Sequence, residues 1–521
     1  MVSPASLLCI HGLPEETLAE IFAFLPRSVL PQVNLTAKSF HRISRPLLFR
    51  DLKIHPYVCI AGYSLLDCPP SGLAIPAEIH IAYLLERLQY WASPEIAPLV
   101  RTCSVSPWSN AGIGPMVSRD DRNGWDFRTN VSDPYILLNA FFDVLPSFTS
   151  LRTFTLKKVH FRQTALKQLE MLPSGTTLCV DGGHVIRREE IDETELDSLP
   201  VSRFKCFHHS GARDACLRQW IPRLDPDVLI HLDLTYNPIF IEQILALTGT
   251  FPRLTTLTVE LLLHHQWSAV LAKFPATETL SIHRFGECEE LTAPHISLDK
   301  LLPLIQEFTG PSELLNYFLV IPTLRRLSLD SWVPPTNPDD IPVYLGRLGM
   351  QNIVSMRTTL FQVQLQSSYF VGFSTLCSTF PNLTELHINI ADATDSDSDK
   401  LDEFLSELEL RQTPLPTSLK KLAIHWSDSG SDPSRKQMSA DVLDRMKNIQ
   451  NSLVSDNPEL RCICLGMDDG SGMMYLWRRG SGSDLVVQKC FDAPCEDWYG
   501  DELADMKSRR EECSQIWNDF C

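Results

Sequence analysis

The chain has 521 residues, of which 44% are hydrophobic, so it can bury at least one large core and is too long for one ordinary compact domain. Its formal net charge of -18 repels phosphate backbones and anionic lipid surfaces, so we expect neither nucleic acid nor a membrane as its partner. The first thirteen residues lack the basic segment and long apolar run of a signal peptide, and no 18-residue apolar stretch occurs. We therefore expect a soluble protein of the cytoplasm or nucleus.

Residues 1–50 predict three short helices. Between Pro14 and Pro26 the apolar residues follow the i, i+3, i+4, i+7 spacing of one helix face. Ser28 suits the N-cap of a second helix, and a third is expected to stop before Pro46, because proline disfavours the helical conformation of the residue that precedes it. Helices this short cannot form a stable core alone, so we expect this head to need a partner surface.

A pattern of apolar residues and prolines runs through residues 10–52: Leu13-Pro14-Glu15, Leu18, Ile21, Leu25-Pro26, Leu30, Val33, Leu35, Lys38, Phe40 and Leu48. This pattern resembles the F-box motif. In that family the motif binds a Skp-type linker protein, which tethers it to a cullin, so the resemblance implies both partners here. Two positions depart from the family pattern, since Phe40 stands where tryptophan is common and Pro31 interrupts the second helix. The alternative is an unrelated three-helix cap. The positions that the resemblance implies for Skp binding are Leu13, Pro14, Leu18, Ile21, Leu25, Leu30, Val33 and Leu35.

Beyond the head a strand pattern recurs, in which proline precedes apolar residues in the order Pro-x-apolar-x-x-apolar-x-apolar; we call the middle apolar residue the anchor. Its clearest copies begin at Pro252, Pro322, Pro381 and Pro458. The anchors at positions 154, 178, 204, 232, 257 and 280 lie 24, 26, 28, 25 and 23 residues apart. These spacings agree with the leucine-rich-repeat period of roughly 20 to 29 residues. Gaps of 51 residues before position 154 and 47 after position 280 indicate an unrecognised strand or an insertion.

The repeat predicts an α/β fold, a right-handed leucine-rich-repeat-like solenoid with a parallel sheet on its concave side, because one repeat cannot bury its apolar face alone. Helical spacing between the anchors, as in residues 80–91 and 401–410, predicts the covering helices. The alternative is an irregular α/β protein with coincidental Pro-Leu strings. An F-box followed by such a body resembles the large F-box families of mushroom-forming fungi. The expected domains are the F-box over 10–52, a linker and N-terminal cap over 53–97, the degenerate solenoid over 98–470, and a C-terminal cap or tail over 471–521.

The sequence contains no recognisable catalytic motif, so we expect a non-catalytic protein with no catalytic residue, no cofactor and no metal. Asp395-x-Asp397-x-Asp399 is similar to the start of a calcium loop, but Lys400 replaces the required glycine. Cys462 and Cys464 lack the second matched pair of a zinc module, and the fifteen cysteines are expected mostly as reduced core thiols. An enzyme whose catalytic groups converge from distant positions stays open as an alternative.

The resemblance implies a substrate-recruiting adaptor of an SCF-type cullin-RING ubiquitin ligase, in which the head binds the Skp-type linker and the repeat body binds an unknown target protein. The alternative is a leucine-rich-repeat interaction scaffold without a role in ubiquitin transfer. Residues that flank the anchors point away from the core, so we expect them to form the target-binding surface. An equally open alternative is that this face of the sheet is only solvated and that loops or the C-terminal tail bind the target. The expected target-binding residues are Arg203, Lys205, His231, Asp233, Arg326, Glu385 and His387.

Overall fold

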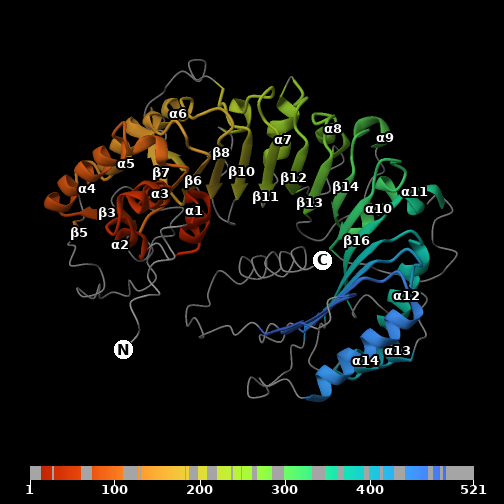
Figure 1. Cartoon of the computed structure of the whole chain (residues 1–521). Helices are drawn as coiled ribbons and strands as arrows, with labels where there is room; N and C mark the ends of the chain where they lie inside the picture. Colours follow the sequence, from red (N-terminus) through yellow and green to blue (C-terminus); the bar gives the residue numbers. More distant parts are fainter. Residues whose placement is uncertain are drawn as a thin grey trace, which may run out of the picture. The chain divides into compact units, whose positions relative to one another are not determined.

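The structure of the chain is a computed structural model (Figure 1). The chain divides into two compact units, Met1–Leu254 and Thr255–Cys521. The structure describes residues 13–25, 28–59, 73–108, 127–128, 131–162, 164–181, 184–186, 198–207, 220–235, 239–247, 249–260, 267–283, 298–330, 347–361, 369–391, 398–410, 415–427, 440–467, 473–480 and 485–488.

The head at the start of the first unit consists of three short helices, α1 (Glu15–Ala23), α2 (Leu30–Asn34) and α3 (Lys38–Leu48). Val29, and not the expected Ser28, is the N-cap of α2, and no side chain caps that helix end. The expected stop before Pro46 is also wrong. The helix α3 continues past the proline, and the Phe49 N–H donates to the Arg45 carbonyl at 3.2 Å, so the helical hydrogen bonding resumes once the residue without an N–H has passed.

The rest of the first unit is built on a parallel sheet, in the strand order β1-β4-β6-β8-β10-β11. One buried anchor lies at the same level in every strand: Leu52, Cys103, Phe154, Leu178, Phe204 and Leu232 are each at most 4% exposed and pair in register. The strands are β1 (Asp51–Ile54), β4 (Thr102–Val105), β6 (Thr153–Lys157), β8 (Thr177–Asp181), β10 (Arg203–Phe207) and β11 (His231–Thr235).

The second unit repeats this arrangement, with the parallel order β12-β13-β14-β15-β16-β17-β18-β19, and ends in the antiparallel strands β20 and β21. Both antiparallel strands lie within the region expected as the C-terminal cap or tail, residues 471–521. The strands are β12 (Thr256–Glu260), β13 (Thr279–His283), β14 (Glu307–Gly310), β15 (Arg326–Leu329), β16 (Ser355–Phe361), β17 (Glu385–Ala391), β18 (Lys421–Ser427), β19 (Cys462–Met467), β20 (Met473–Arg478) and β21 (Leu485–Gln488).

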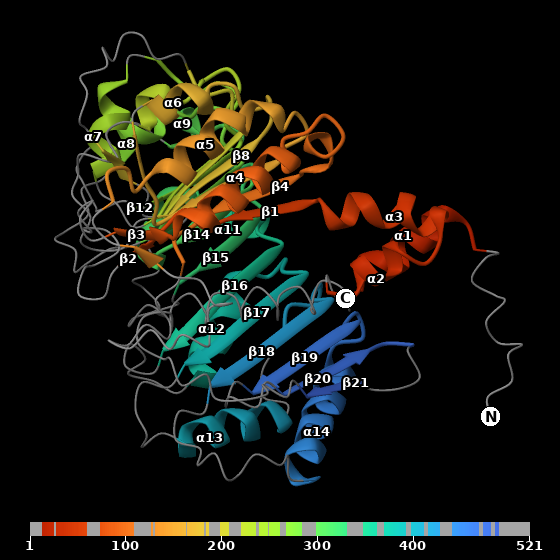
Figure 2. The same cartoon turned by 90° about the vertical axis from the view of Figure 1, so that its left-hand side faces the viewer.

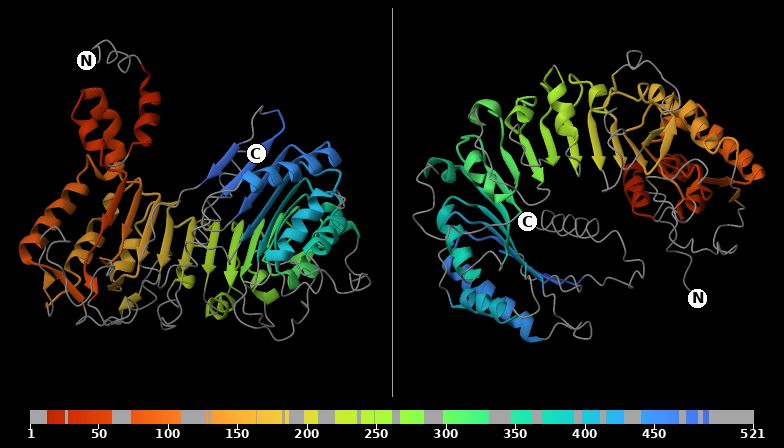
Figure 3. Two further views of the ribbon diagram at one scale, coloured as in Figure 1. Left: turned by 90° about the horizontal axis from the view of Figure 1, so that it is seen from below. Right: turned by 180° about the vertical axis from the view of Figure 1, so that it is seen from behind.

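Within each unit, helices cover one face of the sheet, and Figures 2 and 3 show the same layering from other sides. The helices expected over residues 80–91 and 401–410 are α4 (Glu78–Trp91) and α13 (Ser398–Glu409). The first unit also has the small strands β2 (Val58–Cys59), β3 (Leu73–Pro76), β5 (Phe127–Arg128), β7 (His160–Arg162) and β9 (His184–Ile186). The covering helices are α4 (Glu78–Trp91), α5 (Ile136–Val144), α6 (Thr164–Leu169) and α7 (Ile239–Ala246) in the first unit, and α8 (Trp267–Leu271), α9 (Leu298–Leu301), α10 (Leu315–Phe318), α11 (Arg347–Asn352), α12 (Tyr369–Thr379), α13 (Ser398–Glu409) and α14 (Ala440–Asp456) in the second.

The strict register confirms the parallel, leucine-rich-repeat-like body predicted from the anchors, and it explains the long gaps. The gap of 47 residues after Leu280 contains the unrecognised strand β14, whose anchor is Phe308. The gap of 51 residues before Phe154 is an insertion, because β4 pairs directly with β6. The strand β1 had not been recognised either, and its anchor Leu52 lies at the boundary between the expected head and cap.

A threonine interrupts the apolar inner face of the second unit. The side chain of Thr358 in β16 is 1% exposed and lies in register between Leu329 and Ile388, and its hydroxyl has no hydrogen-bond partner in the part of the chain that the structure describes. A buried hydroxyl without a partner loses its hydrogen bonds to water and gains none in return.

We expect Thr358→Val to raise the free energy of unfolding by about 1 kcal/mol, because it removes the unpaired hydroxyl and keeps the branched shape. Thr384→Val is the matched control, since the Thr384 hydroxyl donates to the Val354 carbonyl at 2.9 Å. Loss of this hydrogen bond should lower the free energy of unfolding. Urea unfolding of the two variants and the parent measures both effects. A destabilised Thr358→Val variant would contradict the interpretation.

Candidate functional site

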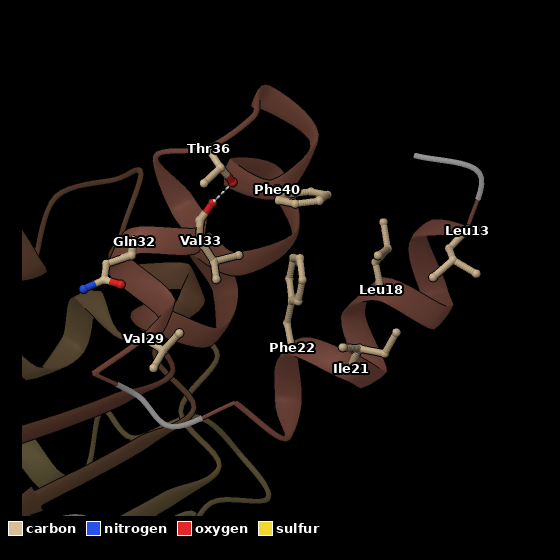
Figure 4. Close-up of a pocket in the computed structure, with 9 residues that line it drawn as sticks. All are labelled: Leu13, Leu18, Ile21, Phe22, Val29, Gln32, Val33, Thr36 and Phe40. Atoms are coloured by element: carbon tan, nitrogen blue, oxygen red, sulfur yellow. Dashed lines mark hydrogen bonds between the residues drawn. The ribbon is translucent and has the colours of Figure 1, made fainter. Parts of the chain in front are cut away.

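An open apolar groove of about 410 Å³ lies between the helices of the head (Figure 4). Leu18, Ile21 and Phe22 come from α1, and the opposite wall comes from α2, from the turn that follows it and from Phe40 of α3. Apart from one amide and one hydroxyl, the lining side chains are apolar. The full lining is Leu13, Leu18, Ile21, Phe22, Val29, Gln32, Val33, Thr36 and Phe40.

The floor of the groove is the small core of the head. Phe22 and Phe40 meet edge to face, with ring centroids 5.1 Å apart and an interplanar angle of 81°, which is a favoured arrangement for aromatic pairs. Leu18, Leu30 and Ile43 complete this core, each at most 9% exposed. So few buried side chains leave the remaining apolar residues of the three helices at the surface.

Polar contacts join the three helices of the head around the groove. Ser44, which is fully buried, donates from its hydroxyl to the Asn34 Oδ1 at 3.0 Å and so joins α3 to α2. Glu15 and Arg42 form an ion pair that joins α1 to α3. At the groove itself the Thr36 hydroxyl donates to the Val33 carbonyl at 2.7 Å, which closes the turn after α2 (Figure 4).

The positions implied for Skp binding fall into three groups. Leu13, Leu18, Ile21 and Val33 line the groove, and Leu13 and Ile21 are 40% and 43% exposed. Leu25 and Leu30 belong to the core of the head. Pro14 is the N-cap of α1, and Leu35 is 84% exposed outside the groove. The groove also contains residues that were not expected at this site, namely Phe22, Val29, Gln32, Thr36 and Phe40.

The end of the head packs directly on the body of the first unit. The Phe49 ring meets Tyr90 and Trp91 of α4 edge to face, with ring centroids 6.0 Å and 5.2 Å apart. The Arg45 guanidinium also pairs with the Glu95 carboxylate at 3.1 Å. These contacts attach the end of α3 to the body, and no residue of α4 lines the groove.

The expected target-binding residues of the first unit lie on adjacent strands. In the register of β10 and β11, Arg203 is opposite His231 and Lys205 is opposite Asp233. Arg203 is exposed, Lys205 and His231 are half-buried, and Asp233 is buried. The structure thus brings these four residues together into one small cluster.

Charge and burial in this cluster affect the imidazole. The pKa of His231 is lowered to about 4, chiefly because burial penalises the charged ring, with further lowering by the positive charges of Lys205 and Arg203. His231 is therefore neutral at pH 7, and the positive charge of the patch comes from Arg203 and Lys205 alone.

In the second unit the expected target-binding residues have partners within the sheet. Arg326 pairs with Glu307 at 3.9 Å, and Glu385 pairs with Lys421 at 3.1 Å. The rings of His387 and His425 lie 4.8 Å apart. Burial, and then the positive charge of Arg357, lower the pKa of His425 to about 4.

Several cysteines lie in the core. Cys103, Cys206 and Cys377 are free and buried, as expected, and burial raises the pKa of these three thiols, so they are not reactive at neutral pH. Cys464 is also free and buried, which differs from the outward orientation expected of a residue that flanks the anchor Ile463. Cys462 departs from the expectation of a reduced thiol because it is disulfide-bonded.

Among the described residues no group of three or more His, Cys, Asp or Glu side chains is placed to hold a metal ion. Asp395 and Asp397 of the candidate calcium loop lie outside the described residues, while Asp399 and Lys400 belong to the helix α13.

No protein-family model and no curated protein matches the chain. Among solved structures, the leucine-rich repeat-containing protein LegL7 from Legionella pneumophila is similar at 12% sequence identity, with a TM-score of 0.30, over 81% of this chain and 91% of that one. A likeness of this size carries no argument, so the description of the body rests on its own strand pairing. In the part of the chain that the structure describes, no helix is both long and apolar enough to cross a membrane.

The pKa of His231 predicts a pH-dependent stability. This pKa lies below the ordinary value of 6.5, so between pH 6.5 and pH 4 the imidazole is protonated in the unfolded chain and neutral in the folded chain. The folded state is therefore destabilised relative to the unfolded state as the pH falls from 6.5 towards 4. The loss should stay below about 1.4 kcal/mol per pH unit, since the side chain is only partly buried. We expect His231→Gln to flatten this part of the profile, as measured by urea unfolding between pH 7 and pH 4. Lys205→Met should flatten it less, and equal slopes in parent and His231→Gln would exclude this contribution.

Proposed function

We propose that the chain is the substrate-recruiting adaptor of an SCF-type cullin-RING ubiquitin ligase. The head binds a Skp-type linker protein and through it a cullin, while the parallel-strand body binds a target protein. The observation that carries the proposal is the open apolar groove of the head. A partner helix whose apolar face enters such a groove buries side chains that the head cannot cover itself.

The exposure of individual side chains supports this role for the head. Leu13 and Ile21 lie at the groove with about two fifths of their surface in solvent, while Phe24 and Leu35, the residues that follow α1 and α2, are 90% and 84% exposed. Apolar exposure concentrated in so small a domain is typical of an interaction surface. Four of the positions implied by the F-box resemblance line the groove, which supports a Skp-type protein as the occupant.

In this proposal the chain is non-catalytic, and it makes or breaks no covalent bond. It holds the target near a conjugating enzyme that carries ubiquitin, so the rate enhancement comes from proximity. The repeated parallel strands offer the body a continuous outward face for target binding.

The second candidate function is a leucine-rich-repeat interaction scaffold that binds a Skp-type protein, or another partner, without directing ubiquitin transfer. The in-register sheet supports both functions equally, because it serves any protein target. Co-purification with a cullin favours the ligase adaptor, and capture of the Skp-type protein without a cullin favours the scaffold.

We expect Leu13→Ala combined with Ile21→Ala to weaken binding to a Skp-type protein by about 2 kcal/mol or more, roughly thirtyfold in Kd, because both side chains line the groove. Isothermal titration with the purified linker protein measures the change. The matched control combines Leu304→Ala with Val320→Ala, which are 49% and 52% exposed in the second unit, and should leave the Kd unchanged. Leu13→Ala combined with Pro14→Ala tests the start of α1 in the same way. Equal affinities of the groove variant and the parent would exclude the groove as the Skp site.

For the body, we expect charge reversal at Arg203, Lys205 and Arg326 to lower target capture several-fold and to leave Skp binding intact, because these residues are not part of the head. Proximity labelling from the parent identifies candidate targets, and pull-down by the variant measures the loss. If capture survives these changes and is lost on deletion of residues 484–521, the tail is the recruiting element.

A further inference from the structure

The first strand of the sheet has one edge to which no described strand is paired. Among the described strands β1 pairs with β4 alone. The Arg50 and Ile54 carbonyls accept hydrogen bonds from the Thr102 and Ser106 N–H groups, both at 3.0 Å. Because successive residues of a strand direct their backbone groups to alternate sides, Lys53 presents its N–H and carbonyl to the other edge. An open edge of this kind is a template for one more strand.

A second groove, of about 360 Å³, runs along this edge between β1 and α4; both elements are labelled in Figure 2. The lining includes every residue of β1, one face of α4 and Trp108. Leu88 and Trp91 form an apolar wall, at 6% and 7% exposure. The groove therefore combines the backbone N–H and carbonyl of Lys53, which no described strand pairs, with apolar side chains. An added strand contacts the first through its backbone and the second through alternate side chains.

The charges of this groove select the kind of strand that it binds. Lys53 and Arg87 are exposed in the lining, against the single carboxylate of Asp51, so the groove is positive in a chain whose net charge is -18. A strand with carboxylates beside its apolar residues complements this charge.

The same charges disfavour a second copy of this chain as the occupant. An antiparallel pair of two β1 strands centred on Lys53 places the two ammonium groups directly opposite each other, and like charges in that position are destabilising. Lysine on an edge strand is a common protection against such self-pairing.

We propose that the groove between β1 and α4 binds an extended segment of a partner protein, with alternating apolar and acidic residues, which adds to the sheet as a strand beside β1. The segment places its acidic side chains near Lys53 and Arg87 and its apolar side chains against Leu88 and Trp91. This site is separate from the groove of the head and does not depend on the proposed ligase role.

The test uses the 521-residue chain and a fluorescein-labelled peptide that alternates glutamate with valine or isoleucine. The comparison peptide has lysine in place of each glutamate. Fluorescence anisotropy should give a Kd for the acidic peptide at least about tenfold lower than for the lysine peptide. Arg87→Glu should raise the Kd of the acidic peptide by about tenfold or more, and Arg152→Glu, an exposed arginine outside the groove, is the matched control.

Two substitutions at one position separate charge from backbone pairing. Lys53→Ala removes the ammonium group and keeps the N–H, whereas Lys53→Pro removes both and leaves the ladder to β4 intact. We expect Lys53→Pro to weaken binding more than Lys53→Ala. A thermal melt checks that each variant folds, and Arg87→Glu keeps the test decisive if the proline variant does not.

Residue-resolved hydrogen exchange completes the test. The Lys53 amide should exchange rapidly in the free chain and slowly with the acidic peptide bound. The proposal is overturned if neither peptide binds below about 1 mM, if both bind equally, if binding survives Arg87→Glu, or if the Lys53 amide is already protected in the free chain. Binding of a Skp-type protein should be the same in the parent and in all of these variants, so this proposal and the proposed function fail independently.

Discussion

In each strand of the body an apolar residue lies beside the equivalent residue of the next strand. The rest of the structure depends on this parallel register. The strand of a single repeat buries only about two side chains, such as Phe154 and Leu156 in β6, so it is stable only because neighbouring repeats cover its backbone and its apolar residues. The register also fixes which residues face outward. Arg203 lies beside His231 because Phe204 lies beside Leu232.

The head follows a different principle, because its three helices bury few side chains and hold their positions through specific contacts. The edge-to-face pair of Phe22 and Phe40 fills its centre, and the hydrogen bond from Ser44 to Asn34 joins two helices inside it. A core of this size stabilises a domain only slightly. Contact of Phe49 with Trp91 adds the support of the body at the end of α3. The head that contains the groove is therefore stabilised partly by its contacts with the body.

The spacing of anchors predicted most of the sheet, and the exceptions have local causes. In β14 glycine replaces the apolar residue after the anchor Phe308, because a Cβ on Gly310 would lie 2.9 Å from the Phe308 ring, which stacks on Phe318. In β16 Thr358 takes the corresponding position after the anchor Met356, so the apolar pattern is broken there too. In the head, the family resemblance indicated Leu13 and Ile21, but the contribution of Phe22 and Phe40 depends on how α1 packs against α3, which spacing along the chain does not contain.

The unequal lengths between anchors have a consequence for how such a chain evolves. Anchor spacings of 23 residues, from Leu257 to Leu280, and of 51 residues, from Cys103 to Phe154, both return to the same register, since the added chain is accommodated between the strands. Each repeat therefore restricts only the few positions that fill the buried columns, and the rest can drift or lengthen without disturbing the sheet. Sequence identity between descendants of one ancestral solenoid should decay much faster than the strand pairing itself, and its outward face can acquire new binding partners while the fold is retained.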